Sequence, residues 1–112
     1  MKTITDVKTA LLTVTQNVRR YSYPNPPADY IVYAEDMQSD ALHGAGTMRN
    51  QTLEGTVDYF TKSLNSNNAK AVQNALLSAG IPFRCNSIQY EPSTGYLHFE
   101  WIIEIESHLL EG

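Results

Sequence analysis

The sequence predicts an α+β fold, in which a four-stranded, mainly antiparallel sheet carries two helices on one face. The expected order along the chain is helix, strand, strand, helix, strand, strand, in a single domain that spans residues 1–112. Two segments repeat apolar residues at helical spacing, and four segments are apolar or alternate as strands do. Each helix has an apolar stripe that must be buried, and a sheet with one apolar face can bury both stripes.

The first helix is expected within residues 1–20, where apolar residues recur at spacings of three and four. Thr3 or Thr5 can cap its start, and Asp6 suits the positive end of the helix dipole. Arg19 and Arg20 suit the other end. Prolines in the segment 23–27 then prevent the helix from continuing. The apolar positions of this repeat are Ile4, Val7, Leu11, Val14 and Val18.

The first pair of strands is expected at residues 29–35 and 51–62. The first of these segments is rich in β-branched and aromatic residues, which favour strands. In the second, Leu53, Val57 and Tyr59 point one way, and Glu54, Thr56 and Asp58 point the other. The run 36–50 between them has no clear period and is expected to be a long loop or hairpin arm.

A second helix is expected over residues 67–79, with Gly80 as its carboxyl-terminal stop. Two closing strands, 83–90 and 96–106, are joined by the turn residues 91–95. The last strand alternates most clearly, since Trp101 and its apolar neighbours two residues away point inward. The side chains that we expect to be buried are Leu11, Val14, Val57, Leu76, Phe99, Trp101 and Ile103.

Charge is distributed unevenly along the chain. The net charge is −4, which argues against a protein that coats nucleic acid electrostatically. Residues 1–20 carry +3, whereas residues 85–112 carry −5 and contain no Lys or Arg. This asymmetry either sets up complementary contacts between copies of the protein or reflects a solvated acidic surface. The sequence contains neither an apolar run long enough to span a membrane nor a signal peptide, so a soluble, intracellular protein is expected.

The residues that carry chemistry do not form a recognisable active site. Cys85 is the single cysteine, and the three histidines, His43, His98 and His108, lack metal-ligand spacing. His98 and Glu100 share a strand face and are either an acid–base pair or an ordinary exposed pair. We therefore expect no enzymatic activity, no metal and no cofactor.

Five carboxylates fall on one surface if the strands 51–62 and 96–106 are neighbours. Such a surface can bind a divalent cation, repel a polyanion that passes it, or keep the protein soluble. The sequence leaves all three interpretations open. The carboxylates are Glu54, Asp58, Glu100, Glu104 and Glu106.

Two segments carry a family resemblance. Residues 28–35, Ala-Asp-Tyr-Ile-Val-Tyr-Ala-Glu, and residues 54–62, Glu-Gly-Thr-Val-Asp-Tyr-Phe-Thr-Lys, resemble the first two strands of small tail-terminator, or tail-completion, proteins of long-tailed bacteriophages and prophages. The proline-containing break, the helix that ends in glycine and the closing hairpin are also similar to that family in order and length.

The resemblance implies a structural protein that forms a ring, typically of six subunits, at the head-proximal end of the tail tube. Such a ring stops tube growth, contacts the tail-tube protein and a neck or head-completion protein, and lets DNA pass without specific binding. It implies a location in the host cytoplasm during assembly and then in the virion tail, with no membrane contact. The alternatives are another neck or tail-tube component, or a small ligand-binding domain or enzyme that uses the His98 and Glu100 face.

This interpretation assigns one set of residues to the channel of the ring and a second set to the subunit interface. The five carboxylates are expected to face the channel of the ring, where a negative potential discourages phosphate from lingering. The subunit interface is expected to include the basic end of the first helix and the apolar residues of the 36–50 loop. The predicted interface residues are Arg19, Arg20, Met37, Leu42 and Met48.

Overall fold

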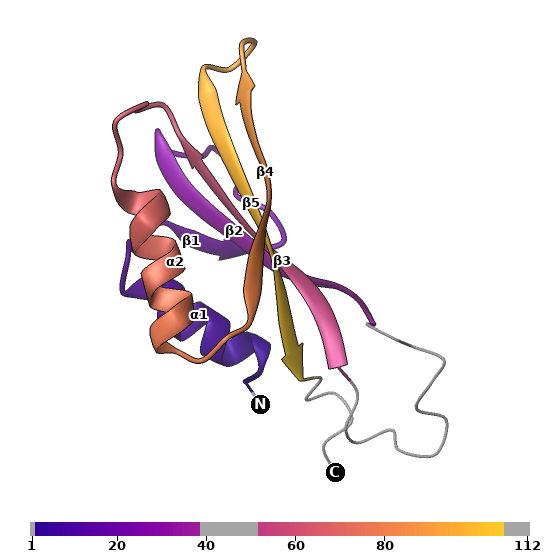
Figure 1. The fold of residues 1–112 in the computed structure, drawn as a ribbon. Helices are drawn as coiled ribbons and strands as arrows, with labels where there is room; N and C mark the ends of the chain where they lie inside the picture. Colours follow the sequence, from indigo (N-terminus) through magenta and orange to yellow (C-terminus); the bar gives the residue numbers. More distant parts are fainter. Residues whose placement is uncertain (1, 39–51, 107–112) are drawn as a thin grey trace.

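The computed structural model describes residues 2–38 and 52–106 (Figure 1). In this part of the chain, two helices pack beside a five-stranded sheet. The elements, in chain order, are α1 (Ile4–Leu12), β1 (Val18–Arg20), β2 (Asp29–Gln38), β3 (Thr52–Thr61), α2 (Asn68–Ser78), β4 (Phe83–Glu91) and β5 (Tyr96–Glu106).

The sheet is mixed, and its strand order is β1-β2-β3-β5-β4. The short strand β1 pairs parallel to β2, whereas the other three pairings are antiparallel. The prediction of a four-stranded, mainly antiparallel sheet was therefore wrong. The N-terminal apolar repeat contains a helix and then a strand, and this extra strand adds a parallel edge to the sheet.

Local hydrogen bonds end α1 early. Three β-branched residues, 13–15, follow Leu12 and are poor helix formers. The Thr13 hydroxyl donates to the Ala10 carbonyl at 2.6 Å, and the Asn17 side-chain amide donates to the carbonyl of Asp29 at 3.1 Å. Val18 is buried as the helical repeat predicted, but it reaches the core from a strand. Arg19 and Arg20 consequently lie on the edge strand β1 instead of at a helix end.

Both helices cover the same face of the sheet, and the core lies between these two layers. The strand register sends odd-numbered residues of β3 and β5 to this covered face, so Val57 lies opposite Trp101. The Trp101 indole N–H donates to Oε1 of Gln73 at 3.0 Å and ties β5 to α2. Of the expected core residues, Val14 and Phe99 are only partly buried. Those confirmed as buried are Leu11, Val57, Leu76, Trp101 and Ile103.

The predicted carboxyl-terminal end of α2 and the predicted turn between β4 and β5 are confirmed. Gly80 has a φ of +73°, and the backbone N–H groups of Gly80 and Ile81 donate to the carbonyls of Leu77 and Leu76. This pattern closes the helix end. Gly95, with a φ of +79°, donates to the carbonyl of Glu91 at 2.8 Å and closes the turn. The β4–β5 hairpin extends beyond the helical layer (Figure 1).

A polar cluster joins the two layers near the start of β2. The Tyr59 hydroxyl donates to Oδ2 of Asp29 at 2.6 Å and also contacts the Ser66 hydroxyl at 2.6 Å. Thr61 donates to the same carboxylate at 3.0 Å, and the Asn68 amide donates to its other oxygen at 3.3 Å. Burial, and then the hydrogen bond to Asp29, raise the pKa of Tyr59. The cluster therefore ties β2, β3 and the start of α2 together.

Candidate interaction surfaces

The sheet face away from the helices carries aligned carboxylates. In the β3–β5 register, Glu54 lies directly opposite Glu104, and Asp58 lies directly opposite Glu100. Glu106 lies opposite Thr52 at the end of the same two strands. The structure thus brings the five predicted acidic residues onto neighbouring strands. We call Glu54, Asp58, Glu100 and Glu104 the acidic face.

One carboxylate of the acidic face is held by a histidine. His98 Nε2 lies 2.7 Å from Oδ1 of Asp58, and His98 Nδ1 lies 3.6 Å from Oε2 of Glu91. The imidazole also stacks on Phe60, with ring centroids 4.1 Å apart. The hydrogen bond to Asp58, opposed by burial and supported by the surrounding carboxylates, raises the pKa of His98. His98 therefore pairs with Asp58 and Glu91, whereas the sequence left open an acid–base pair or an ordinary exposed pair with Glu100.

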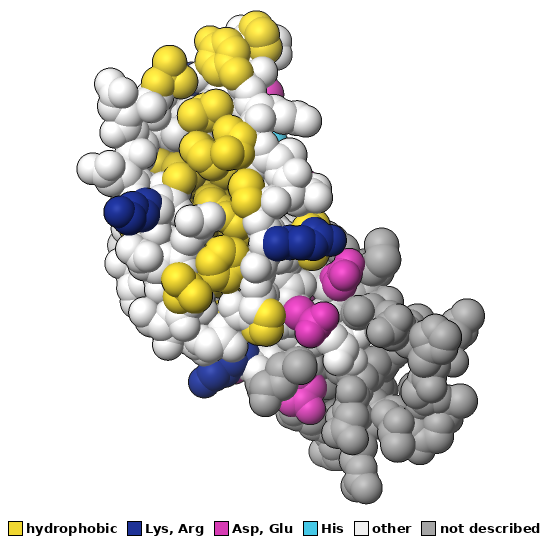
Figure 2. Space-filling model, in the orientation of Figure 1, with side chains coloured by type: hydrophobic (Ala, Val, Ile, Leu, Met, Phe, Trp, Pro, Cys, Tyr) yellow, Lys and Arg dark blue, Asp and Glu magenta, His cyan; other side chains and the backbone are white. Residues whose placement is uncertain are grey.

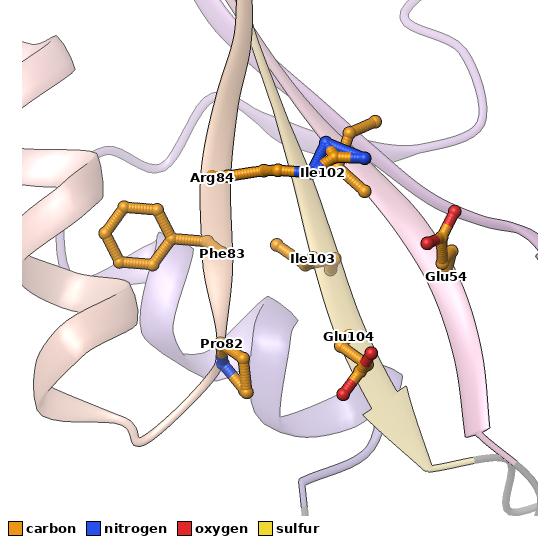
Figure 3. Close-up of a pocket in the computed structure, with 7 residues that line it drawn as sticks. All are labelled: Glu54, Pro82, Phe83, Arg84, Ile102, Ile103 and Glu104. Carbon is orange, nitrogen blue, oxygen red and sulfur yellow. The ribbon is translucent and has the colours of Figure 1, made fainter. Parts of the chain in front are cut away.

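A shallow hollow of about 190 Å³ separates the other pair of carboxylates from β4 (Figure 3). The Arg84 side chain extends from β4 across Ile102, while Glu54 and Glu104 project from β3 and β5. Among the described ion pairs, none includes these three charged side chains. Pockets for small molecules usually enclose about 300–1,000 Å³. This hollow is smaller than that range, whereas an open hollow of about 330 Å³ beside His98, lined also by Tyr30 and Phe60, falls within it. The ligand-binding alternative therefore stays a prediction.

The two N-terminal arginines lie at the opposite edge of the sheet. Arg20 forms an ion pair with Glu35, and the Tyr21 hydroxyl donates to the same carboxylate at 2.7 Å. The guanidinium of Arg19 lies 4.8 Å from the centre of the Tyr23 ring. Arg20 thus already has an acidic partner within its own chain.

The remaining predicted interface residues belong mostly to the 36–50 segment. The strand β2 continues to Gln38 and pairs there with β3, so residues 36–38 belong to a hairpin arm, the second of the two predicted forms, and not to a loop. The backbone of Met37 pairs with that of Glu54. Leu42 and Met48 lie outside the described residues.

An exposed apolar surface on the β4–β5 hairpin was not predicted. Ile88 and Tyr90 are 58% and 56% exposed, and they pair with Phe99 and Leu97, respectively. We call these four residues the hairpin face. Figure 2 shows hydrophobic side chains gathered in a band between α2 and β4.

The described residues show no metal cluster and no membrane-spanning helix, and comparison with known proteins identifies no family. In residues 2–38 and 52–106, no group of three or more His, Cys, Asp or Glu side chains could hold a metal ion. Neither described helix is long and apolar enough to cross a membrane. No known protein-family model matches the sequence, and a search of curated proteins finds no match.

Proposed function

We propose that this chain is a structural subunit of a bacteriophage or prophage tail, which forms a ring at the head-proximal end of the tail tube. The ring stops tube growth, offers a docking surface to a neck or head-completion protein, and surrounds the path of the DNA. The observation that carries this proposal is the alignment of four carboxylates in two cross-strand pairs on the face away from the helices.

Aligned carboxylates lower the stability of a sheet, but they suit a channel through which DNA must pass without binding. Like charges directly opposite each other on neighbouring strands destabilise a sheet, and we expect a cost similar in size to the roughly 0.2–1 kcal/mol that favourable cross-strand pairs contribute. DNA carries one negative charge per about 1.7 Å of its length, so a wall of carboxylates weakens its attraction to the protein. The Asp58–Glu100 pair is relieved by local partners, since His98 holds Asp58 and the Asn86 amide donates to Glu100 at 2.7 Å. A negative channel lining therefore explains why the sequence retains the Glu54–Glu104 pair, which takes part in no described ion pair.

The distribution of charge along the chain supports self-association. Residues 1–20 carry +3, and in the structure Arg19 and Arg20 lie at the β1 edge, where Arg20 is paired with Glu35 of the same chain. The carboxylates of β5 lie three strands away. A ring requires a head-to-tail interface between two different surfaces of the subunit. Opposite charges on separate parts of one chain favour that kind of contact.

The role of the acidic face is tested with the double variant Glu100→Lys/Glu104→Lys on assembled rings. We expect the variant rings to retain DNA at low salt and to release it as the salt concentration rises. The neutral variant Glu100→Gln/Glu104→Gln should retain an intermediate amount, because it removes repulsion without adding attraction. If the lysine rings retain no more DNA than wild-type rings at low salt, the acidic face does not line the channel.

A further inference from the structure

The two edges of the sheet differ in how well they are protected against pairing with another strand. The strand order places β1 at one edge and β4 at the other. β1 is three residues long and carries two arginines, and the chain turns away directly after it at Tyr21, whose φ is +71°. Short length and charged side chains are devices by which natural sheets keep an edge from pairing with a second chain. The β1 edge therefore offers little to a further strand.

The second half of β4 lacks these devices. A bulge between Cys85 and Ser87 interrupts the strand, but the residues after it, 87–91, pair with β5 in regular register. This half contains no Lys, Arg, Pro or Gly, and its one charged residue, Glu91, lies at the end. A regular edge of this kind is a template for pairing with another chain. We call residues 87–91 the open edge.

The helices do not reach the side chains of the open edge. A helix rises about 1.5 Å per residue, so the 11 residues of α2 span about 16 Å. A strand rises about 3.3 Å per residue, so the 11 residues of β5 span about 36 Å, and the β4–β5 hairpin projects beyond the helical layer (Figure 1). Ile88 and Tyr90 therefore stay more than half exposed, although they pair with residues of the covered face.

The open edge is complementary to itself when two copies run antiparallel. With Gln89 opposite Gln89 of the second copy, every residue of the open edge has a partner. Ile88 of each copy then lies opposite Tyr90 of the other, on the same face, and such aromatic–β-branched pairs stabilise sheets. Ser87 of each copy lies opposite Glu91 of the other, so no two like charges face each other.

Other registers fit less well. If Ile88 lies opposite its own copy, Tyr90 lies opposite Asn86 at the bulge. If Tyr90 lies opposite its own copy, Ile88 lies opposite Pro92, which has no N–H group to donate. A shift by one residue sets Ile88 opposite Gln89 and sends the apolar side chains of the two copies to opposite faces. The pattern of side chains therefore selects the register centred on Gln89.

We propose that the open edge pairs with the open edge of a second copy, antiparallel and with Gln89 opposite Gln89. This pairing adds about four to six backbone hydrogen bonds, because antiparallel strands exchange two bonds at every second residue pair. Both copies use the same surface, so the contact has two-fold symmetry and closes at two copies. It differs from the head-to-tail contact of the proposed ring, and its test needs neither tail tubes nor DNA. The outcome is therefore independent of the tail-terminator role.

A single engineered cysteine tests the register. Cys85→Ser removes the native thiol, and Gln89→Cys in this background sets two cysteines directly opposite each other, within the Cα separation of about 7 Å that a disulfide can bridge. Ser87→Cys is the matched control on the same strand and face, but its two copies would lie four residues, or about 13 Å, apart along the strands. With oxidised glutathione, Gln89→Cys should form disulfide dimers at least about tenfold faster than Ser87→Cys. Equal rates would overturn the proposal.

Sedimentation equilibrium measures the association itself, up to about 1 mM protein. Ile88→Lys should weaken dimer formation at least about tenfold, because it places a charge in both central apolar pairs. Leu77→Lys is the control, since Leu77 is 66% exposed but lies near the end of α2, which leads into the opposite end of β4. It should leave association within about twofold of wild type.

Heteronuclear NMR spectra check that each variant folds, and Tyr90→Lys replaces Ile88→Lys if that variant unfolds. Both positions are exposed, so the fold should persist. A wild-type chain that is monomeric at about 1 mM would overturn the proposal. An Ile88→Lys variant that associates like wild type, or a Leu77→Lys control that is equally defective, would overturn it as well.

Discussion

Replacing Glu104 with glutamine should stabilise the protein. In the β3–β5 register, the Glu104 carboxylate lies directly opposite Glu54, and both lie on the sheet face away from the helices. Neither takes part in a described ion pair. Glutamine keeps the size and shape of the side chain and removes the repulsion. A gain in stability from Glu104→Gln would show that the acidic face is retained at a cost.

The expected gain is about 0.5 kcal/mol. Two unit charges about 6 Å apart repel by about 0.7 kcal/mol in bulk water, and by more where the effective dielectric constant is lower. Favourable cross-strand pairs contribute between about 0.2 and 1 kcal/mol, and we take the same range for the repulsion. Glu104 is exposed and can turn away from Glu54, which favours the middle of that range.

The assay is urea unfolding of wild type, Glu104→Gln and the control Glu106→Gln at two salt concentrations. Glu106 lies on the same strand and face but opposite Thr52, so its replacement removes a charge without relieving a pair. The gain from Glu104→Gln should shrink in 1 M salt, where the screening length falls to about 3 Å. An equal gain in both variants, or one that is independent of salt, would refute direct repulsion between Glu54 and Glu104.

Three further predictions concern the fold around these surfaces. Tyr59→Phe should lower the free energy of unfolding by about 1.5–3 kcal/mol, because Asp29 loses a charge-assisted hydrogen bond. Urea unfolding measures this loss, and a value below about 0.5 kcal/mol would contradict the prediction. His98 has a raised pKa when folded, so its contribution to stability should be present below about pH 6.5 and should decline as the pH rises through the folded pKa. NMR titration and stability curves of wild type and His98→Gln check this, and an unchanged pH dependence in the variant would contradict it. Gly55→Ala should destabilise the protein by about 1–3 kcal/mol, since the new Cβ would lie 2.5 Å from the Ala34 carbonyl oxygen. Thermal unfolding measures the effect, and an unfolding temperature equal to that of wild type would contradict it by showing that the strands adjust freely.

Patterns that depend on one element at a time were predictable from the sequence. Alternation along β5 places Trp101 in the core, because side chains of a strand point to opposite faces in turn. Gly80 ends α2 because the residue just after a helix often takes a positive φ, which glycine adopts without strain. The shared surface of the carboxylates was predicted only on the condition that β3 and β5 are neighbours, and the structure shows that these strands pair.

Features that depend on two elements were not predictable in the same way. Val18 fits both a helical repeat and an inward-facing strand position, so spacing alone could not reveal β1. The side chains around Asp29 come from segments about 30 or more residues apart, and no local pattern links them. The hairpin face became visible only when the lengths of the helices and strands could be compared in the structure. The tail-terminator role, the ring and its partners stay predictions.

The most direct test of the central claim is the growth of the tail tube itself. Cognate tail-tube protein is polymerised with and without this chain, and tube lengths and ends are measured by negative-stain electron microscopy. We predict that added protein stops elongation and forms a ring at one end of each tube, with no decoration along the sides. Tubes that grow to the same length with bare ends, or protein that polymerises into open tubes of its own, would contradict the account.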